Sequence, residues 1–275
     1  MPKFSVIDLT KAGLLVPLVY GQRTRYDFPR GFGVNAITAW VPGVILAAGL
    51  TGASWGAASL SYALGYIAFF CLYEIGYMVN DSYGLRHDPT PRPRCPVPIT
   101  IGFAALFVAV RLSVFVLLLS YLNLWTAPIY LGAVAALLVV LVLHNLLRQV
   151  ELKIFSFVQL SLLRFLLPLL PALLLSEAEG HITTVLATGG VLFTLPRLLT
   201  YLDAKGRLTL PERKERPFYL QAHLASAPLV AVIALVADTP APIYVLGWLI
   251  LAQVAYVALG ARRSAMSPSQ KASQA

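Results

Sequence analysis

Carboxylates, an amide and arginines gather in one short stretch of the chain, between Asn80 and Arg94. Asn80, Asp81 and Asp88 offer the oxygen ligands that Mg²⁺ takes, since this ion binds through one or two carboxylates while substrate phosphates complete its shell. Arg92 and Arg94 follow, and guanidinium groups bind phosphate oxygens through paired hydrogen bonds. A polar turn needs only one Asn or Asp, so this density of both charges favours a site for magnesium and phosphate.

A second group of polar residues follows a later apolar segment, and it comprises Arg197, Tyr201, Asp203, Lys205 and Arg207. Asp203 adds a carboxylate, and the three basic side chains add charge that suits phosphate oxygens. Both groups lie at the ends of apolar segments that we assign to the same side of a membrane. Helix packing can bring them over one cavity, although sequence spacing alone does not require it.

Five further charged residues stand beside or inside apolar segments. Arg148 and Lys153 lie at the start of one segment and Arg164 lies in its middle, while Glu74 and Arg111 lie within two others. Ionisable residues inside a bilayer are costly and usually functional. For the charges within or at the end of the apolar segments, the alternative interpretation is an internal ion pair or a side chain that reaches back to the membrane surface. These charges are Glu74, Arg111, Arg164, Arg197 and Asp203.

The elements that carry these residues are apolar helices. Of the 275 residues, 58% are hydrophobic and only 12% are charged, against about 25% charged in a soluble domain. A helix crosses a bilayer with roughly 20 apolar residues, and the continuous runs exclude a barrel. We predict an all-α membrane protein, a bundle of about eight (eight to nine) transmembrane helices. The eight expected spans are residues 35–53, 58–79, 100–122, 125–147, 155–175, 182–202, 218–237 and 240–261.

The chain is predicted to form a single transmembrane domain over residues 1–261. Residues 1–34 form a cytoplasmic arm within it, and the apolar stretch 9–20 in this arm is too short to span and contains Pro17, so we expect an interfacial or re-entrant helix. Residues 262–275 are rich in Ser, Ala and Gln, which predicts a disordered cytoplasmic tail.

The basic residues assign an orientation. The formal net charge is +9, and Lys and Arg occur in every second loop, whereas the loops near residues 176–181 and 238–239 hold Glu177, Glu179 and Asp238. By the positive-inside rule both termini are cytoplasmic and the protein is a multi-pass protein of a plasma or inner membrane. Because the charge is divided among the spans, we do not expect nucleic acid as a partner.

At these residues the chain resembles the UbiA-type intramembrane prenyltransferase superfamily. The first family motif reads N-D-x-x-D-x-x-x-D followed by R-P. Asn80, Asp81 and Asp88 occupy its first, second and last positions, Arg92 precedes a proline as in the family, and Gly84 stands where the middle Asp is expected. The resemblance implies a UbiA-like fold.

The second family motif reads D-x-x-x-D, and here Asp203 fits its first position while Arg207 stands at its second. One branch, the decaprenyl-phosphate phosphoribosyltransferases, is similar in further details. These are the P-T-x-R stretch at residues 89–94, the basic residue Arg148 and the Leu-Arg pair that ends at Arg164.

The resemblance implies a membrane transferase that acts on an isoprenoid or polyprenyl (di)phosphate and transfers a prenyl group to an acceptor. Mg²⁺ and arginines would stabilise the charge of the departing diphosphate, with Asp81 and Asp203 as catalytic residues. The expected Mg²⁺ ligands are Asn80, Asp81, Asp88 and Asp203. The expected substrate-binding residues are Asn80, Arg92, Arg94, Arg148, Lys153, Arg164, Arg197, Tyr201, Lys205 and Arg207.

Two alternatives stay open. One is phosphoribosyl transfer to a polyprenyl phosphate. The other is a protein that binds or transports a polyprenyl phosphate without catalysis, which Gly84 and Arg207 favour because they replace acids of the family motifs. In each case the expected partners are an isoprenoid or polyprenyl phosphate lipid and membrane lipids, and the sequence leaves a homo-oligomer open.

Overall fold

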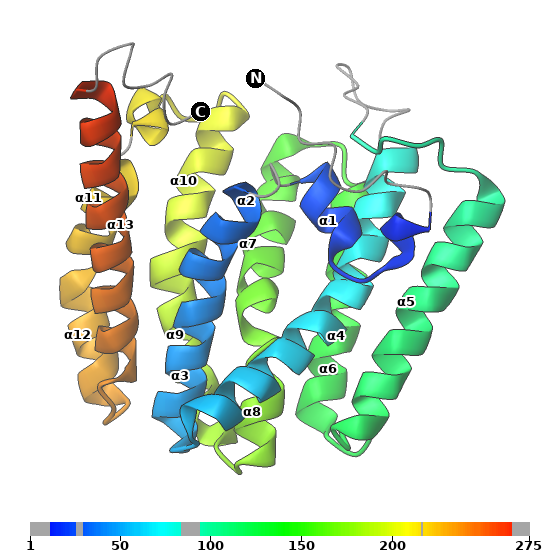
Figure 1. The fold of residues 1–275 in the computed structure, drawn as a ribbon, viewed down its shortest axis with the longest axis horizontal. Coiled ribbons are helices and arrows are strands. Elements are labelled where there is room, and N and C mark those ends of the chain that lie inside the picture. The colour runs from blue at the N-terminus through cyan, green and yellow to red at the C-terminus, as the bar shows by residue number, and fades with distance from the viewer. Residues whose placement is uncertain (1–11, 26–29, 84–93, 216, 266–275) are drawn as a thin grey trace.

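The computed structural model describes residues 12–25, 30–83, 94–215 and 217–265. Every regular element within these residues is a helix (Figure 1). The α-helices are α1 (Val19–Thr24), α2 (Arg30–Asn35), α3 (Val41–Thr51), α4 (Trp55–Ser82), α5 (Ile101–Tyr121), α6 (Pro128–Leu146), α7 (Val150–Leu166), α8 (Leu170–Leu175), α9 (Ile182–Gly189), α10 (Leu195–Ala204), α11 (Phe218–Ala225), α12 (Ala227–Val236) and α13 (Ala241–Ala265). The shorter segments are η1 (Gly13–Leu15), η2 (Ala36–Trp40), η4 (Glu179–His181), η5 (Gly190–Thr194) and η6 (Pro211–Lys214).

Six helical stretches of the described chain are long and apolar enough to cross a membrane, and the pair α11–α12, bent by 43°, would make a seventh. The described part of the chain is therefore all-helical, and it has the character of a multi-pass membrane protein. The expected span at 155–175 is divided between α7 and α8, because Pro168 lacks the amide that a continuous helix needs. The six stretches are Gly33–Thr51, Trp55–Ser82, Ile101–Tyr121, Pro128–Leu146, Glu179–Ala204 and Ala241–Leu259.

The ends of the chain differ in part from expectation. The expected interfacial helix at 9–20 is represented by η1 and the start of α1, and residues 1–11 lie outside the described part. The expected disordered tail at 262–275 begins within α13, which continues to Ala265, and residues 266–275 lie outside the described part.

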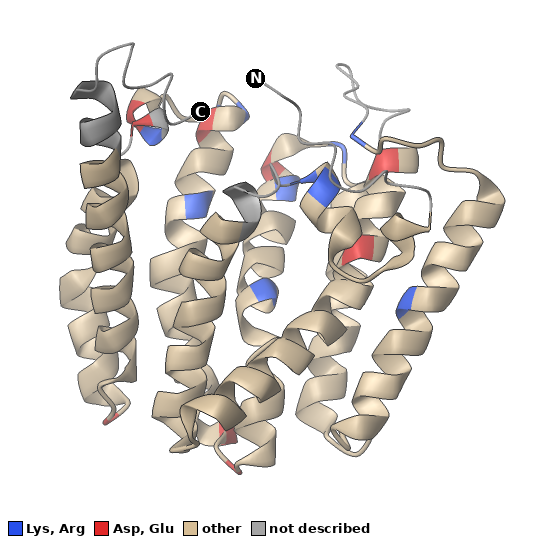
Figure 2. Ribbon diagram, in the orientation of Figure 1, with Lys and Arg blue, Asp and Glu red and all other residues tan. Residues whose placement is uncertain are grey.

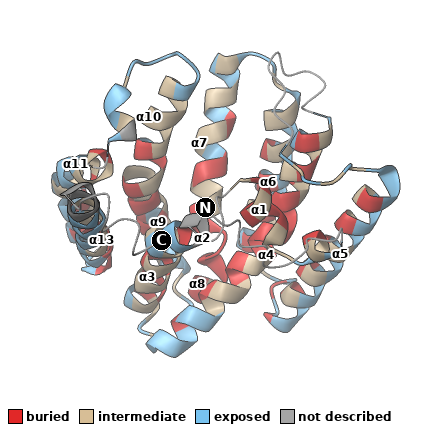
Figure 3. Cartoon of the chain, turned by 45° about the horizontal axis from the view of Figure 1, so that its top comes forward, coloured by how far each residue is buried: buried red, intermediate tan, exposed pale blue. Residues whose placement is uncertain are grey.

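The outer surface of the bundle is apolar. Large hydrophobic side chains such as Leu117, Leu235, Val236 and Leu251 are two-thirds or more exposed, and Figure 3 shows the buried residues on the faces that the helices turn toward one another. Figure 2 shows the basic residues toward the end of the bundle where α4 and α10 finish, while the described charges at the opposite end are acidic. This arrangement suits a bilayer around the helices.

Helix α4 crosses the bundle obliquely and carries much of its core (Figure 1). Its aromatic residues form a continuous row of ring contacts, with Tyr66 and Phe70 centroids 4.6 Å apart. A Cβ at Gly65 would lie 2.4 Å from the carbonyl oxygen of Pro168. Only glycine therefore lets α4 approach the break between α7 and α8 so closely.

Two π-helical segments interrupt the spans, and a proline follows each. Pro42 follows η2 and Pro196 follows η5, and a proline leaves an earlier carbonyl in the helix without its amide partner. The indole Nε1 of Trp248 donates to the carbonyl of Ile37 at 2.9 Å. These breaks are thus built into the fold, with side chains from other helices supplying hydrogen bonds beside them.

Candidate functional site

Helices α7 and α10 lie side by side and run in opposite directions (Figure 1). Two ring stacks join α7 to the α9–η5–α10 segment: the centroids of Phe157 and Tyr201 are 4.2 Å apart, and those of Phe165 and Phe193 are 4.4 Å apart. Phe157 and Phe165 are eight residues apart on α7, and Tyr201 and Phe193 are eight residues apart on the opposing segment, so the two antiparallel segments stay in register between the stacks. Each residue of α7 is therefore level with a known residue of the opposing segment, which places Ser161 at the level of Arg197.

Basic side chains follow this register on both helices. On α10 and its C-cap, Arg197, Tyr201 and Lys205 are spaced by four residues and follow one face. On α7, Lys153 precedes Phe157 by four residues, so Lys153 is level with Lys205 across the pair. We call four cations of these two helices and their ends the basic ladder, and its members are Lys153, Arg164, Arg197 and Lys205.

Arg197, in the deep part of the ladder, lies within the stretch Glu179–Ala204, which is long and apolar enough to cross a membrane. The side chain of Arg197 is half-buried, and among the residues that the structure describes no Asp or Glu forms an ion pair with it. Arg164 donates to the amide oxygen of Asn35 at 3.1 Å and lies over the ring of Phe70 at 5.6 Å. Asn35 in turn donates to the hydroxyl of Tyr66 at 2.6 Å, which joins α7 to α2 and α4.

The mouth of the ladder lies at the end of the bundle where α7 begins. The ammonium of Lys205 is 5.9 Å from the ring centroid of Tyr201. Near it, His144 is hydrogen-bonded to the hydroxyl of Ser156 at 2.8 Å. The register of the two ring stacks places Lys153 level with Lys205 at this end.

Two other predicted phosphate ligands lie outside the ladder. Arg207 pairs with Glu151 at 2.6 Å, and both side chains are at least half exposed. Arg148 is exposed in the turn before α7. A surface pair of this kind contributes little to stability.

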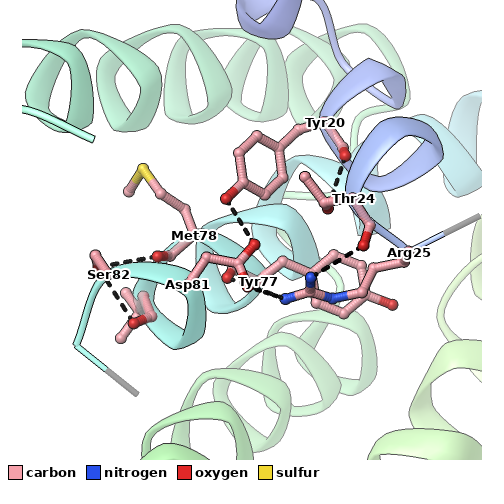
Figure 4. Close-up of polar contacts among 8 residues, drawn as sticks. Tyr20, Thr24, Arg25, Tyr77, Met78, Asp81 and Ser82 are labelled. Atoms are coloured by element: carbon pink, nitrogen blue, oxygen red, sulfur yellow. Dashed lines mark hydrogen bonds and ion pairs between the residues drawn. The ribbon is translucent and has the colours of Figure 1, made fainter. Parts of the chain in front are cut away.

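Asp81 has both carboxylate oxygens engaged by the N-terminal segment. Figure 4 shows Tyr20 and Arg25 converging on it: the Tyr20 hydroxyl donates at 2.8 Å and a guanidinium nitrogen of Arg25 at 2.7 Å. Burial, and then the charge of Asp81, raise the pKa of the Tyr20 hydroxyl above its ordinary value, so it remains a donor. Arg25 also lies over the ring of Tyr77 at 4.6 Å.

Asp203 has both oxygens engaged as well. It accepts a hydrogen bond from the backbone amide of Leu210 at 2.9 Å and pairs with the guanidinium of Arg213. It stands two residues from Tyr201 and from Lys205, about 200° around the helix from each. Asp203 therefore faces away from the basic ladder and holds the loop that follows α10.

Glu74 and Arg111 form a fully buried ion pair at 2.7 Å. Glu74 also accepts from the backbone amides of Gly21 and Leu18, at 2.6 and 3.2 Å. The Arg111 guanidinium donates to the carbonyls of residues 14, 15 and 16. The internal ion pair that was one interpretation of these residues is present, and it holds the N-terminal segment against α4 and α5.

Only part of the predicted magnesium site lies within the described residues. Asp88 and Arg92 lie outside the described residues, and Asn80 and Arg94 are exposed. Within the described chain, no three His, Cys, Asp or Glu side chains are grouped as a metal site requires. Because protein donors engage both oxygens of Asp81 and of Asp203, these carboxylates do not fit Mg²⁺ in this arrangement.

Sequence reasoning did not single out Asn35, Phe157 or the pairing of α7 with α10. The four-residue spacing from Arg197 to Lys205 was a usable signal for one face of the ladder, but nothing local shows which helix lies opposite. Comparison of the chain with family models, with curated proteins and with solved structures gives no match. The assignment of a function therefore depends on the motif residues and on this geometry.

Proposed function

We propose that the protein binds an isoprenoid or polyprenyl phosphate in the membrane, with the phosphate on the basic ladder between α7 and α10. The observation that carries the proposal is Arg197, a half-buried cation inside a span for which the described residues supply no carboxylate. A cation at this depth is expensive unless an anion neutralises it. Lys153 and Lys205 at the mouth add further positive charge, which attracts an anion toward the ladder.

A lipid phosphate suits this place for two physical reasons. Guanidinium groups bind phosphate oxygens in pairs, and Arg164 and Arg197 lie on facing helices about one turn apart in level. The surrounding helices are apolar on their outer faces, so a hydrocarbon chain leaving the ladder sideways would enter the lipid. A soluble phosphate compound would gain nothing from that surface.

The proposal includes the arrangement expected of a UbiA-like bundle. We infer that α7 and α8 together form a further broken span, which would make eight with the six continuous helices and the bent pair α11–α12. An even number places both termini on one side, and the basic end of the bundle in Figure 2 makes that side cytoplasmic by the positive-inside rule. The ladder mouth would then open to the cytoplasm of a plasma or inner membrane.

A second candidate is transfer chemistry of the UbiA type, either prenyl transfer or phosphoribosyl transfer to a polyprenyl phosphate. It is favoured by the position of Asn80, Asp81 and Asp203, since α4 and α10 both end at the mouth end of the bundle. Mg²⁺, with Asp88 as a further ligand, would supply charge for a departing diphosphate. Magnesium binding would require Asp81 to exchange Arg25 and Tyr20 for the metal.

Binding can be measured on purified protein in detergent, by native mass spectrometry with a long-chain polyprenyl phosphate. We expect Arg197→Gln to weaken binding by about tenfold or more, the usual effect of losing a charge-assisted hydrogen bond. Arg207→Gln, an exposed and already paired cation, is the matched control and should change it little. Equal binding of the phosphate and of the matching polyprenol, or equal effects of the two variants, would contradict the proposal.

Transfer is separated from binding by the products. A transferase releases diphosphate when it is given an isoprenoid diphosphate or phosphoribosyl diphosphate with an acceptor, and chelation of Mg²⁺ stops it. Asp81→Asn should then abolish release while leaving polyprenyl phosphate bound. Binding that is insensitive to a chelator, without diphosphate release from any of these donors, assigns the non-catalytic function instead.

A further inference from the structure

The face that the α9–η5–α10 segment turns to α7 keeps a strict four-residue spacing across the π-helical break. Its positions are Gly189, Phe193, Arg197, Tyr201 and Lys205. A Cβ at Gly189 would meet the ring of Phe165 at 2.3 Å, Phe193 stacks on that same ring, and Tyr201 stacks on α7 two turns higher. Positions on both sides of the break therefore face one helix.

A regular α-helix would not allow this. At about 100° per residue, the sixteen steps from Gly189 to Lys205 amount to about 160° beyond whole turns, which would carry Lys205 to the far side. The wider turn of η5 accommodates one extra residue and so removes about 100° of this drift. The π segment is thus what sets the rotation of Arg197 and Lys205 relative to α7.

A side chain from α11 holds a backbone group at this break. Pro196 has no N–H to offer the carbonyl of Leu192 four residues earlier. The Nε2 of His223 lies 3.3 Å from that oxygen, and Nε2 must be the donor because a carbonyl oxygen only accepts. His223 is 3% exposed, so without it the carbonyl would be left in the interior with one fewer partner.

We propose that His223 is a positioning residue for the basic ladder: its bond to Leu192 fixes the π break and thereby turns Arg197 toward α7. The effect on a lipid ligand rests on the proposed function, whereas the effect on helix rotation does not. At the other break a side chain from another helix also donates to a π-segment carbonyl, here five residues before Pro42. Trp248 bonds the carbonyl of Ile37 in η2, two residues from the Asn35 that contacts Arg164.

The test compares three variants at two readouts. His223→Phe removes the donor, His223→Gln retains an N–H donor, and Leu224→Phe changes an exposed neighbour on the same helix as the control. Rotation of α10 is read by pulsed electron paramagnetic resonance between spin labels at the exposed positions Leu152→Cys and Ala204→Cys, with both native cysteines replaced. Affinity is read with a long-chain polyprenyl phosphate.

We expect His223→Phe to change the distance between the labels by about 5 Å or more, as a rotation by one residue of helix would, and to weaken phosphate binding about tenfold. His223→Gln should restore both readouts, and Leu224→Phe should leave both unchanged. If His223→Phe is not recovered folded, His223→Met serves, because its flexible side chain fills space without an N–H donor.

An unchanged label distance in the donor-free variant overturns the positioning role, whatever happens to binding. A changed distance in His223→Gln as large as in His223→Phe also overturns it, because volume and not the hydrogen bond would then be responsible. If the wild-type protein binds no polyprenyl phosphate while the distance still depends on the donor, the positioning role stands and the proposed function fails.

Discussion

The buried charges of this protein divide into those with partners inside the chain and those without. Glu74 and Arg111 are fully buried, and the hydrogen bonds and ion pair described for their side chains join them to each other or to the backbone of the N-terminal segment. Such a pair is tolerated because its lone pairs and protons are satisfied. Arg197 lacks an acidic partner among the described residues, and that contrast separates a structural ion pair from a site open to a ligand.

Removing one member of the structural pair should be costly. Glu74→Gln leaves the Arg111 charge buried without its counter-ion, so we expect the free energy of unfolding to fall by about 3 kcal/mol. The exposed pair of Arg207 with Glu151 is the control, and Arg207→Gln should cost less than about 1 kcal/mol. Unfolding in mixed detergent micelles measures both variants, and similar losses would contradict the difference in burial.

For individual residues, the sequence predicted which charged side chains lie in apolar segments, but it did not predict their partners. An internal ion pair was an explicit alternative for Arg111, because an isolated guanidinium in a span needs one. Asp81, in contrast, matched a metal-binding motif, yet Tyr20 and Arg25 contact it from 61 and 56 residues away. Contacts over such separations depend on how the N-terminal segment docks, which no local pattern encodes.

The N-terminal segment is the element whose position depends most on these polar contacts. Leu18 adopts a left-handed backbone conformation with φ of 74°, which is unfavourable for a side chain of this size. Its amide and that of Gly21 are both held by Glu74. The carboxylate therefore stabilises a turn that the local sequence alone would avoid.

Gly21 allows the segment to approach α4. A Cβ there would lie 3.1 Å from Oε1 of Glu74, whose position Arg111 constrains, so we expect Gly21→Ala to weaken docking by about 1 kcal/mol. Trypsin should then cleave after Arg23 several-fold faster, because cleavage follows the population of the undocked state. Gly102→Ala, which meets nothing within 4 Å, is the control, and equal cleavage of the two variants would contradict the contact.

For the larger elements, hydropathy predicted most spans because each is a continuous apolar run. Prolines lie at two of the interruptions: Pro168 separates α7 from α8, and Pro196 follows η5. The rotation of α10 could not be predicted. It depends on the π segment η5, and His223 on another helix, α11, contacts the Leu192 carbonyl of that segment. Hydrophobic periodicity locates a helix, but it does not show that one extra residue has rotated the part of the helix that follows.

At the scale of the whole molecule, charge is sorted along the axis of the bundle. The described loops at one end carry Glu177, Glu179 and Asp238, while the basic residues lie toward the other end (Figure 2). The same sorting brings cations to the mouth of the basic ladder. The proposed binding of a lipid phosphate would therefore be linked to orientation, because the side on which the mouth opens would determine which leaflet supplies the lipid.

This orientation can be tested with single cysteines in a protein whose native cysteines are replaced. Ser176→Cys and Thr209→Cys are conservative changes at exposed positions near opposite ends of the bundle. If the basic end is cytoplasmic, a membrane-impermeant maleimide should label Ser176→Cys in intact cells, and Thr209→Cys only after the cells are opened. The reverse pattern would place the ladder mouth outside the cell, and the lipid phosphate would then have to come from the outer leaflet.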